Sequence, residues 1–337
     1  MQTKKNGEHV IEEVAADFYR AEIPLPDSVL KVVNSYVIRD GERNLIIDTG
    51  MYNERCFDAM QRAVKKLDVD LEKTDFFVTH SHGDHIGLVY QLVHPGSVVH
   101  ISEPEIQIIS GLQGKTRLLD IEAFLHMSAF PNKDPEKIFP PYAGRQHKSG
   151  VTLAFRIVND GDVFERGGYR FRCVHTPGHS KGHMCLYEPD KKILIAGDHI
   201  LKDITPGIQG KSAFEDPLAD YLASLDKIYA LDIDTVLPGH RHPFVNPRSR
   251  ITAIKEHHRQ RNNEVLAILR EGSRNVYDLA SRMTWNVDAD SWDSFPVTQS
   301  FFATGEAFAH LRYLEERGEV IKKMEGQVAI YSLNQPR

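Results

Sequence analysis

The chain has 337 residues, of which 41% are hydrophobic and 26% are charged, proportions that are ordinary for a globular protein and exclude a disordered or fibrous class. This length is sufficient for about two domains with substantial cores. The formal net charge of −6 and the pI near 6.3 provide no general attraction for polyphosphate, so nucleic acid is disfavoured as a partner.

The N-terminal residues are polar and lack the apolar segment of a signal peptide, and no run approaches the roughly 18 apolar residues of a membrane span. We therefore expect a cytoplasmic protein that does not cross a membrane. The cysteines Cys56, Cys173 and Cys185 are an odd number without close spacing, which fits reduced thiols in the same compartment.

The first third of the chain alternates strand-like and helix-like segments. Residues 30–38 and 44–48 are predicted to be paired strands joined by the turn at Asp40 and Gly41. The segments expected next are a helix at 54–67, a strand at 75–79, a helix at 86–93 and a strand at 98–101. We expect the second helix to start at His85, where its dipole would help to keep that imidazole neutral for metal binding. The alternation predicts a layered α/β architecture.

A cluster of metal-binding side chains follows the apolar strand at 76–78, because His80, His82, Asp84 and His85 lie within one short loop. Imidazole and carboxylate groups together suit zinc, iron or manganese. Two histidines two positions apart on a tight loop can face one ion, and Asp84 and His85 then face a second ion.

Residues 109–149 interrupt the alternation with aromatic side chains scattered among prolines and charged residues, including Phe124, Phe130, Phe139 and Tyr142. We interpret this segment as an inserted cap that would give the metals a hydrophobic substrate pocket. The alternative is a helical pair that packs its aromatic side chains onto the core or onto a second copy.

Three later apolar runs each deliver one further ligand-type residue through a glycine or proline turn. These residues are His179, Asp198 and His240. Open sheets carry their sites at strand ends of this kind, so we expect the three side chains to join the first cluster.

The C-terminal part reads as a second unit. Strands dominate at 153–198, a helix follows at 217–231, and a polar helix at 249–270 forms the bridge. The unit itself is expected to have helices at 276–283 and 297–317 and strands at 320–324 and 328–333, an order similar to a winged helix. Its long helix lacks a basic N-terminal turn, which favours packing or dimerisation over binding of nucleic acid. The predicted domains are 1–247, including the cap, and 248–337.

The order of the ligand-type residues resembles the metallo-β-lactamase superfamily, whose pattern is His-x-His-x-Asp-His, then a distant His, an Asp and a last His. The resemblance covers about residues 27–245. It implies a four-layered αββα metallo-β-lactamase fold, with a small winged-helix-like C-terminal domain as in some members. It also implies two metal ions, one bound by His80, His82 and His179 and the other by Asp84, His85 and His240. Asp198 would bridge the ions, and Asp48 would orient the loop from behind.

Departures from other branches narrow the implied activity. Asp198 stands where the zinc lactamases have cysteine, and His82 stands where the di-iron oxygen reductases have glutamate. The long insertion of the RNA-processing nucleases is missing before His240. The spacing is most similar to glyoxalase II-like hydrolases. His183 and His199 lie close to ligands and are candidates for substrate contact, with a hydrogen-bonded supporting role as the alternative.

The resulting prediction is a dinuclear metal-dependent hydrolase that uses a metal-bridging hydroxide to cleave a thioester, ester or lactone of a small molecule. Asp84 is the candidate for handling protons. Zinc is the first choice of cofactor, with iron or manganese left open. A metal-dependent phosphodiesterase or ribonuclease and a non-enzymatic regulator or scaffold remain as alternatives, and a homodimer is also left open.

Overall fold

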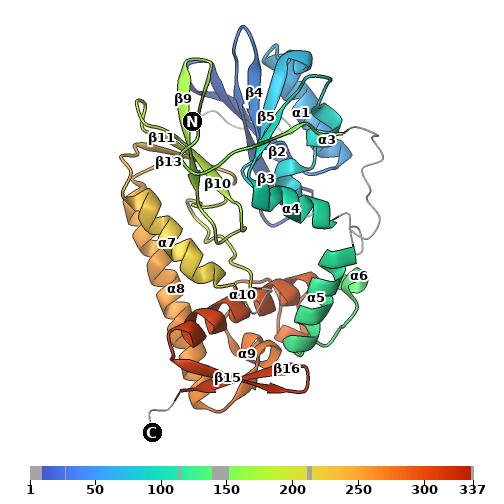
Figure 1. Cartoon of the computed structure of the whole chain (residues 1–337), viewed down its shortest axis with the longest axis vertical. Coiled ribbons are helices and arrows are strands. Elements are labelled where there is room, and N and C mark those ends of the chain that lie inside the picture. The colour runs from blue at the N-terminus through green and yellow to red at the C-terminus, as the bar shows by residue number, and fades with distance from the viewer. Residues whose placement is uncertain (1–9, 27, 113–114, 139–151, 211–214, 335–337) are drawn as a thin grey trace.

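The computed structural model describes residues 10–26, 28–112, 115–138, 152–210 and 215–334. Two β-sheets lie next to each other in the upper part of the molecule, with helices on their outer sides, and a mainly helical C-terminal unit lies below them (Figure 1). The predicted layered α/β architecture is confirmed. None of the helices within these residues is long and apolar enough to span a membrane.

The first sheet follows chain order from β1 to β7. Its strands are β1 Ile11–Ala15, β2 Phe18–Pro24, β3 Val32–Ile38, β4 Asn44–Ile47, β5 Thr74–Phe77, β6 Val99–Ile101 and β7 Phe155–Ile157. Strands β1 to β4 are antiparallel because short turns join them, as predicted for β3 and β4. Strands β4 to β7 are parallel because longer segments carry the chain back across the sheet.

The second sheet has the order β13-β12-β11-β10-β9-β8. Its strands are β8 Val163–Arg166, β9 Tyr169–His175, β10 Met184–Glu188, β11 Ile193–Gly197, β12 Thr235–Pro238 and β13 Phe244–Val245. Only β11 and β12 pair in parallel in the described sheet, and α7 Pro217–Tyr229 lies between them in the chain. The ends of β5, β11 and β12 therefore deliver loops toward the same edge of the two sheets.

Side-chain alternation explains the layering. In β4, Leu45 and Ile47 belong to the core between the two sheets, whereas Ile46 packs with the helices outside the first sheet. In β11, Ile195 faces the first sheet and Leu194 packs with α7 on the opposite side. A strand that is buried on both faces needs such continuous apolar runs.

The helices fall into groups by the face that they cover. Beside the first sheet lie α1 Glu54–Lys66, the short helix η1 Leu71–Lys73, α2 Gly83–Ile86, α3 Val89–Leu92 and α4 Glu103–Leu112. Beside the second sheet lie α7 and α8 Pro247–Arg270. The first half of α8 packs on this sheet and the second half packs in the C-terminal unit, so one helix joins the two cores.

The prediction of one continuous helix at 86–93 is wrong, because the chain forms two separate short helices here, α2 and α3. Gly87 lies between them, and a Cβ at this position would collide with backbone atoms of Gly83 and Tyr52. This close approach to the loop after β4 interrupts the helix. His85 consequently lies inside the short helix α2 and not at the start of a long one.

The C-terminal unit continues from α8 through β14 Arg274–Asn275, α9 Val276–Arg282, the short helix η2 Trp292–Ser294, α10 Val297–Glu316, β15 Val320–Glu325 and β16 Val328–Leu333. Strands β14, β16 and β15 form a small antiparallel sheet in that order. The long helices and the last two strands lie within a few residues of their expected positions. Strand β14 was not expected, because two residues carry no recognisable alternation.

The described part of the predicted cap consists of the end of α4, α5 Lys115–Met127 and α6 Pro135–Ile138. Phe124 packs edge-on against Phe301 of α10 with ring centroids 5.7 Å apart, and Phe130 lies 6.0 Å from the same ring. Both side chains are buried in the C-terminal core. They therefore do not form the expected pocket over the metals, and the alternative of packing onto the core holds for them. Phe139 and Tyr142 lie outside the described residues.

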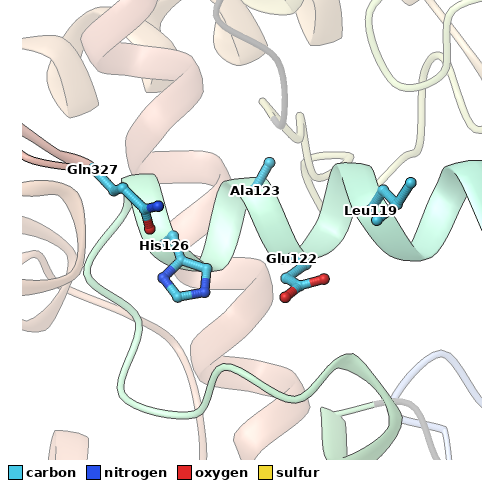
Figure 2. Close-up of a pocket in the computed structure, with 5 residues that line it drawn as sticks. All are labelled: Leu119, Glu122, Ala123, His126 and Gln327. Atoms are coloured by element: carbon cyan, nitrogen blue, oxygen red, sulfur yellow. The ribbon is translucent and has the colours of Figure 1, made fainter.

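A pocket of about 500 Å³ is found on α5 (Figure 2). It is lined by Leu119, Glu122, Ala123, His126 and Gln327, the last of which lies in the turn between β15 and β16. No predicted metal ligand lines this pocket, so it is separate from the candidate site described below.

Two buried histidines connect α8 to α10. Nδ1 of His258 lies 3.4 Å from Nε2 of His310, and Nδ1 of His310 lies 2.7 Å from Oδ1 of Asn262. His258 is 1% exposed, and burial lowers its pKa to about 3 because a charged imidazole is poorly solvated there.

We expect acid to destabilise the protein partly through His258. Between pH 6.5 and about 3 the unfolded chain takes up a proton that the folded protein excludes, so the stabilisation is complete above pH 6.5 and is lost as the pH falls. At pH 5 this group should cost about 2 kcal/mol of unfolding free energy. Urea unfolding at pH 7.5 and 5 should show a smaller pH dependence for His258→Leu and an unchanged one for exposed His94→Leu. Equal pH dependence in wild type and His258→Leu would contradict this assignment.

Candidate metal centre

The loops that carry the predicted ligands converge at one edge of the two sheets. The segment after β5, which includes the short helix α2, carries four of these residues, and the β9–β10 connection and the ends of β11 and β12 carry one each. All seven lie in overlapping groups whose potential ligand atoms are within 4.8 Å of one another. The structure therefore brings together His80, His82, Asp84, His85, His179, Asp198 and His240.

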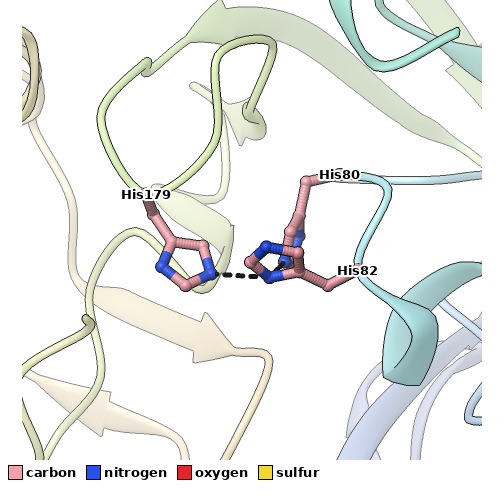
Figure 3. Close-up of side chains that lie close together, drawn as sticks. All are labelled: His80, His82 and His179. Atoms are coloured by element: carbon pink, nitrogen blue, oxygen red, sulfur yellow. Dashed lines mark hydrogen bonds between the residues drawn. The ribbon is translucent and has the colours of Figure 1, made fainter. Parts of the chain in front are cut away.

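The first group, here called site 1, consists of His80, His82 and His179 (Figure 3). Nδ1 of His82 lies 2.9 Å from Nε2 of His80 and 3.1 Å from Nε2 of His179. His80 is fully buried, whereas His82 is exposed. Site 1 is therefore anchored in the core on one side and accessible from solvent on the other.

The second group, site 2, consists of Asp84, His85 and His240. Oδ2 of Asp84 lies 3.4 Å from Nε2 of His240 and 3.9 Å from Nε2 of His85. Both imidazoles are fully buried, and Asp84 is partly exposed. The carboxylate is thus the part of site 2 that solvent reaches.

Asp198 lies between the two groups. Its Oδ2 is 3.6 Å from Nε2 of His179 in site 1 and 3.3 Å from Nε2 of His240 in site 2. Its Oδ1 is 3.5 Å from Nε2 of His85. One carboxylate therefore reaches ligand atoms of both groups, as a bridging ligand would.

The outward ring nitrogens of three histidines are held by fixed acceptors. Nδ1 of His85 lies 2.7 Å from Asp48, Nδ1 of His179 lies 2.9 Å from the Gly207 carbonyl, and Nδ1 of His240 lies 2.7 Å from the Val32 carbonyl. An acceptor at Nδ1 fixes the proton there and leaves Nε2 free to bind a metal. The structure thus orients these three rings with Nε2 facing the centre.

Asp48 is placed behind site 2, where its carboxylate accepts three hydrogen bonds. Oδ1 accepts from the backbone N–H of Thr79 at 2.9 Å, and Oδ2 accepts from the Thr79 hydroxyl at 2.8 Å and from His85. Asp48 therefore ties the end of β4 to the start of the ligand loop and orients His85.

The donor set fits divalent cations. Among the described residues, Nε2 of His85, Nε2 of His240 and Oδ1 of Asp198 are buried without a hydrogen-bond partner. Buried polar atoms are rarely left unsatisfied, and cations between these groups would satisfy all three. Imidazole nitrogens and carboxylate oxygens suit zinc, iron or manganese.

The electrostatics of the cluster favour positive charge at its centre. Burial disfavours the charged form of His240, but the carboxylates of Asp198 and Asp84 outweigh burial and raise its pKa to about 10. For His85, burial is likewise outweighed, mainly by Asp48 and Asp198, so its pKa is well above the usual value. In the metal-free protein these carboxylates therefore outweigh any helix dipole at His85. A cation that binds must displace protons from these rings.

Comparison with known proteins identifies the family. Residues 29–240 match the family described as the metallo-β-lactamase superfamily. The chain belongs to the metallo-β-lactamase superfamily. Its sheets and flanking helices have the α/β metallo-β-lactamase fold that the resemblance implied.

Relatives within the superfamily include named thioesterases. Atrochrysone carboxyl ACP thioesterase of Emericella nidulans is 26% identical over 300 residues, which cover 88% of this chain and 79% of the relative. Acyl-coenzyme A thioesterase MBLAC2 of Homo sapiens is 28% identical over 226 residues, which cover 63% of this chain and 74% of the relative. The prediction that this metallo-β-lactamase superfamily chain is a hydrolase is confirmed.

A solved structure resembles almost the whole chain. A β-lactamase domain protein from Burkholderia ambifaria has a TM-score of 0.80 and 25% identity, covering 96% of this chain and 93% of that one. The similarity therefore extends beyond the superfamily match and includes the C-terminal unit.

Of the two roles considered for His183 and His199, burial favours a supporting role over substrate contact, because neither residue has any exposed surface. Nδ1 of His183 lies 2.8 Å from the Thr176 hydroxyl, and its Nε2 accepts from the backbone N–H of Asp198 at 3.1 Å. His183 thus supports a predicted ligand from behind. His199 packs against Tyr221 with ring centroids 5.3 Å apart.

Two residues that support the ligand loops were not predicted from the sequence. The Asn34 side chain donates to the carbonyls of Pro238 and Arg241 at 2.9 and 2.8 Å, on either side of His240. Glu105 joins two ligand loops and is treated below. Neither residue lies in a recognisable motif, so only the spatial contacts reveal them.

Proposed function

We propose that the protein is a dinuclear metal-dependent hydrolase of acyl thioesters. The observation that carries this proposal is the convergence of the seven predicted ligands, with Asp198 between the two groups. Thioesters are favoured over esters and lactones because relatives are named as a carboxyl ACP thioesterase and an acyl-coenzyme A thioesterase. The glyoxalase II-like assignment remains our interpretation of the ligand spacing.

In this proposal His80, His82 and His179 of site 1 would hold one cation, Asp84, His85 and His240 of site 2 would hold the other, and Asp198 would be a ligand shared by the two sites. Zinc is our first choice, because the imidazole-rich set with carboxylates suits it, and iron and manganese remain alternatives. When bound, such a pair polarises a carbonyl oxygen and supplies hydroxide near neutral pH.

The chain's own residues then have separate tasks. Asp48, Gly207 and Val32 hold three imidazoles in the tautomer that presents Nε2. Asp84 is our candidate for accepting and returning a proton, because its carboxylate is partly exposed next to site 2. The buried members of the cluster are not accessible for that task.

We interpret residues 248–337 as a winged-helix-like domain, with α10 as its central helix. Helix α10 is buried along most of its length and packs against α7, α8 and α9. A helix covered in this way cannot enter a nucleic-acid groove without unfolding the unit. This packing supports a structural role for the domain and argues against the ribonuclease alternative.

A substrate screen of the metal-quantified protein tests the proposed function. We expect turnover of acyl-CoA thioesters and about 100-fold lower turnover by His82→Ala, because site 1 loses a ligand. His94→Ala, at an exposed histidine, should behave as wild type. Lactones, phosphodiesters and single-stranded RNA serve as the other substrate classes. Equal thioester turnover by His82→Ala, or cleavage of RNA without thioester turnover, would contradict the proposal.

A further inference from the structure

A buried carboxylate outside the ligand set joins the two loops of site 1. Glu105 lies in the first turn of α4 and has no exposed surface. Its Oε2 accepts from the backbone N–H of Ser81 at 2.8 Å. Its Oε1 accepts from the Ser180 hydroxyl and from the backbone N–H of Gly182, each at 2.7 Å. Both oxygens of one side chain are therefore used, one on each loop.

The positions of these donors relate Glu105 to the predicted ligands. Ser81 lies between His80 and His82, and Ser180 directly follows His179. Site 1 takes ligands from both loops, so its geometry depends on the distance between them. Site 2 takes two ligands from the segment after β5 and one from the loop after β12. In the described structure Glu105 forms no hydrogen bond with the loop after β12.

The start of α4 packs closely against the second loop at Gly182. The Ser102 hydroxyl donates to the Gly182 carbonyl at 2.6 Å, so the Gly182 peptide is held at both its N–H and its carbonyl. A Cβ at Gly182 would collide with the Ser102 hydroxyl and lie 2.9 Å from Cγ of Glu105. The absence of a side chain at Gly182 permits this approach.

Burying a carboxylate is unfavourable unless hydrogen bonds compensate for the lost hydration. Glu105 receives three, and two come from backbone N–H groups of the ligand loops. No Lys, Arg or His within the described residues forms a salt bridge with it, so its partners are the loops themselves. The chain therefore keeps a buried carboxyl group whose hydrogen-bond partners in the described structure are donors in the two loops of site 1.

We propose that Glu105 is a positioning residue that sets the separation of the two loops and so the geometry of site 1. The inference rests on the proposed metal-dependent function, but it concerns the binding of the ion and not the choice of substrate. Within the described residues, Glu105 forms no hydrogen bond with a predicted ligand side chain. It acts through Ser81, Ser180 and Gly182.

The test is Glu105→Gln in the full-length protein, with Glu103→Gln as the matched control. Glu103 lies two residues away on α4, is exposed and loses the same charge. A glutamine can present one oxygen to one loop, but its amide group then faces N–H donors on the other loop. We expect about 10- to 100-fold weaker zinc binding at site 1 by equilibrium dialysis, with binding at site 2 retained. The visible absorption of the cobalt-loaded variant should lose the contribution of one ion.

Two further variants keep the proposal testable if Glu105→Gln folds poorly by circular dichroism. Ser180→Ala removes one donor and should weaken zinc binding at site 1 relative to wild type. Glu105→Asp retains the carboxylate and should keep more of the wild-type zinc affinity than Ser180→Ala. Wild-type zinc affinity and cobalt absorption in folded Glu105→Gln, or in Ser180→Ala where Glu105→Gln does not fold, would overturn the proposal. Wild-type protein that binds two ions but leaves thioesters intact would instead overturn the proposed function alone.

Discussion

Replacing Asp198 by asparagine is expected to lower kcat/KM for thioesters at least about 1000-fold, equivalent to about 4 kcal/mol of transition-state stabilisation. Asp198 is the carboxylate that reaches nitrogens of both groups, at 3.6 Å from His179 and 3.3 Å from His240. An asparagine has one oxygen and no charge, so it cannot join two cations in the same way. We expect no more than one tightly bound ion per chain.

Metal analysis and steady-state kinetics check this expectation. Asp190→Asn is the matched control, because Asp190 is an exposed residue in the turn before β11, the strand that ends at Asp198. The control should keep two ions and wild-type turnover. Two tightly bound ions together with near-normal kcat/KM in Asp198→Asn would refute the bridging role.

Replacing Asp84 by asparagine is expected to lower kcat about 1000-fold with a smaller effect on metal content. Asp84 contributes one carboxylate to site 2 and lies 3.4 Å from Nε2 of His240. The amide has nearly the same shape but cannot accept a proton near neutral pH. The histidines of site 1 are unchanged, so the ion there should remain. A large fall in kcat with little change in metal content would show that Asp84 handles protons and does not act only by holding the metal.

The pH dependence of kcat gives the decisive measurement for Asp84. The carboxylates are held ionised in the metal-free protein, since the neighbouring His85 and His240 keep the pKa of Asp84 below its usual value despite burial. Because this lowered pKa keeps Asp84 ionised throughout the accessible pH range, Asp84→Asn should lower kcat at every pH without removing a limb of the profile. Asp68→Asn, at an exposed aspartate after α1, should leave the profile unchanged. An unaltered kcat in Asp84→Asn across this range would assign proton handling to another group.

Much of the secondary structure is predictable from local patterns. The helix at 54–67 and the strands at 320–324 and 328–333 were placed within a residue or two, because their apolar periodicity is regular. The helix at 86–93 failed, because the interruption at Gly87 results from backbone contact with a distant loop. Periodicity contains no information on such contacts.

The candidate site was predictable to the extent that its residues stand in a motif. The cluster from His80 to His85, followed at strand ends by His179, Asp198 and His240, indicates that these side chains converge. The choice between substrate contact and a supporting role for His183 and His199 could not be made from the sequence, because proximity in sequence to a candidate ligand does not tell which way a ring points. Both rings are fully buried.

Residue identity and short-range alternation are therefore sufficient to predict the seven candidate ligands, their order and the layered α/β class. Only the tertiary structure decided which groups hold the ligands in place, such as Glu105 between two loops and Asn34 beside His240. It also decided that Phe124 and Phe130 stabilise the C-terminal core. The physical reason is that hydrogen bonding and packing between distant segments depend on how the chain folds back on itself, which no local pattern encodes.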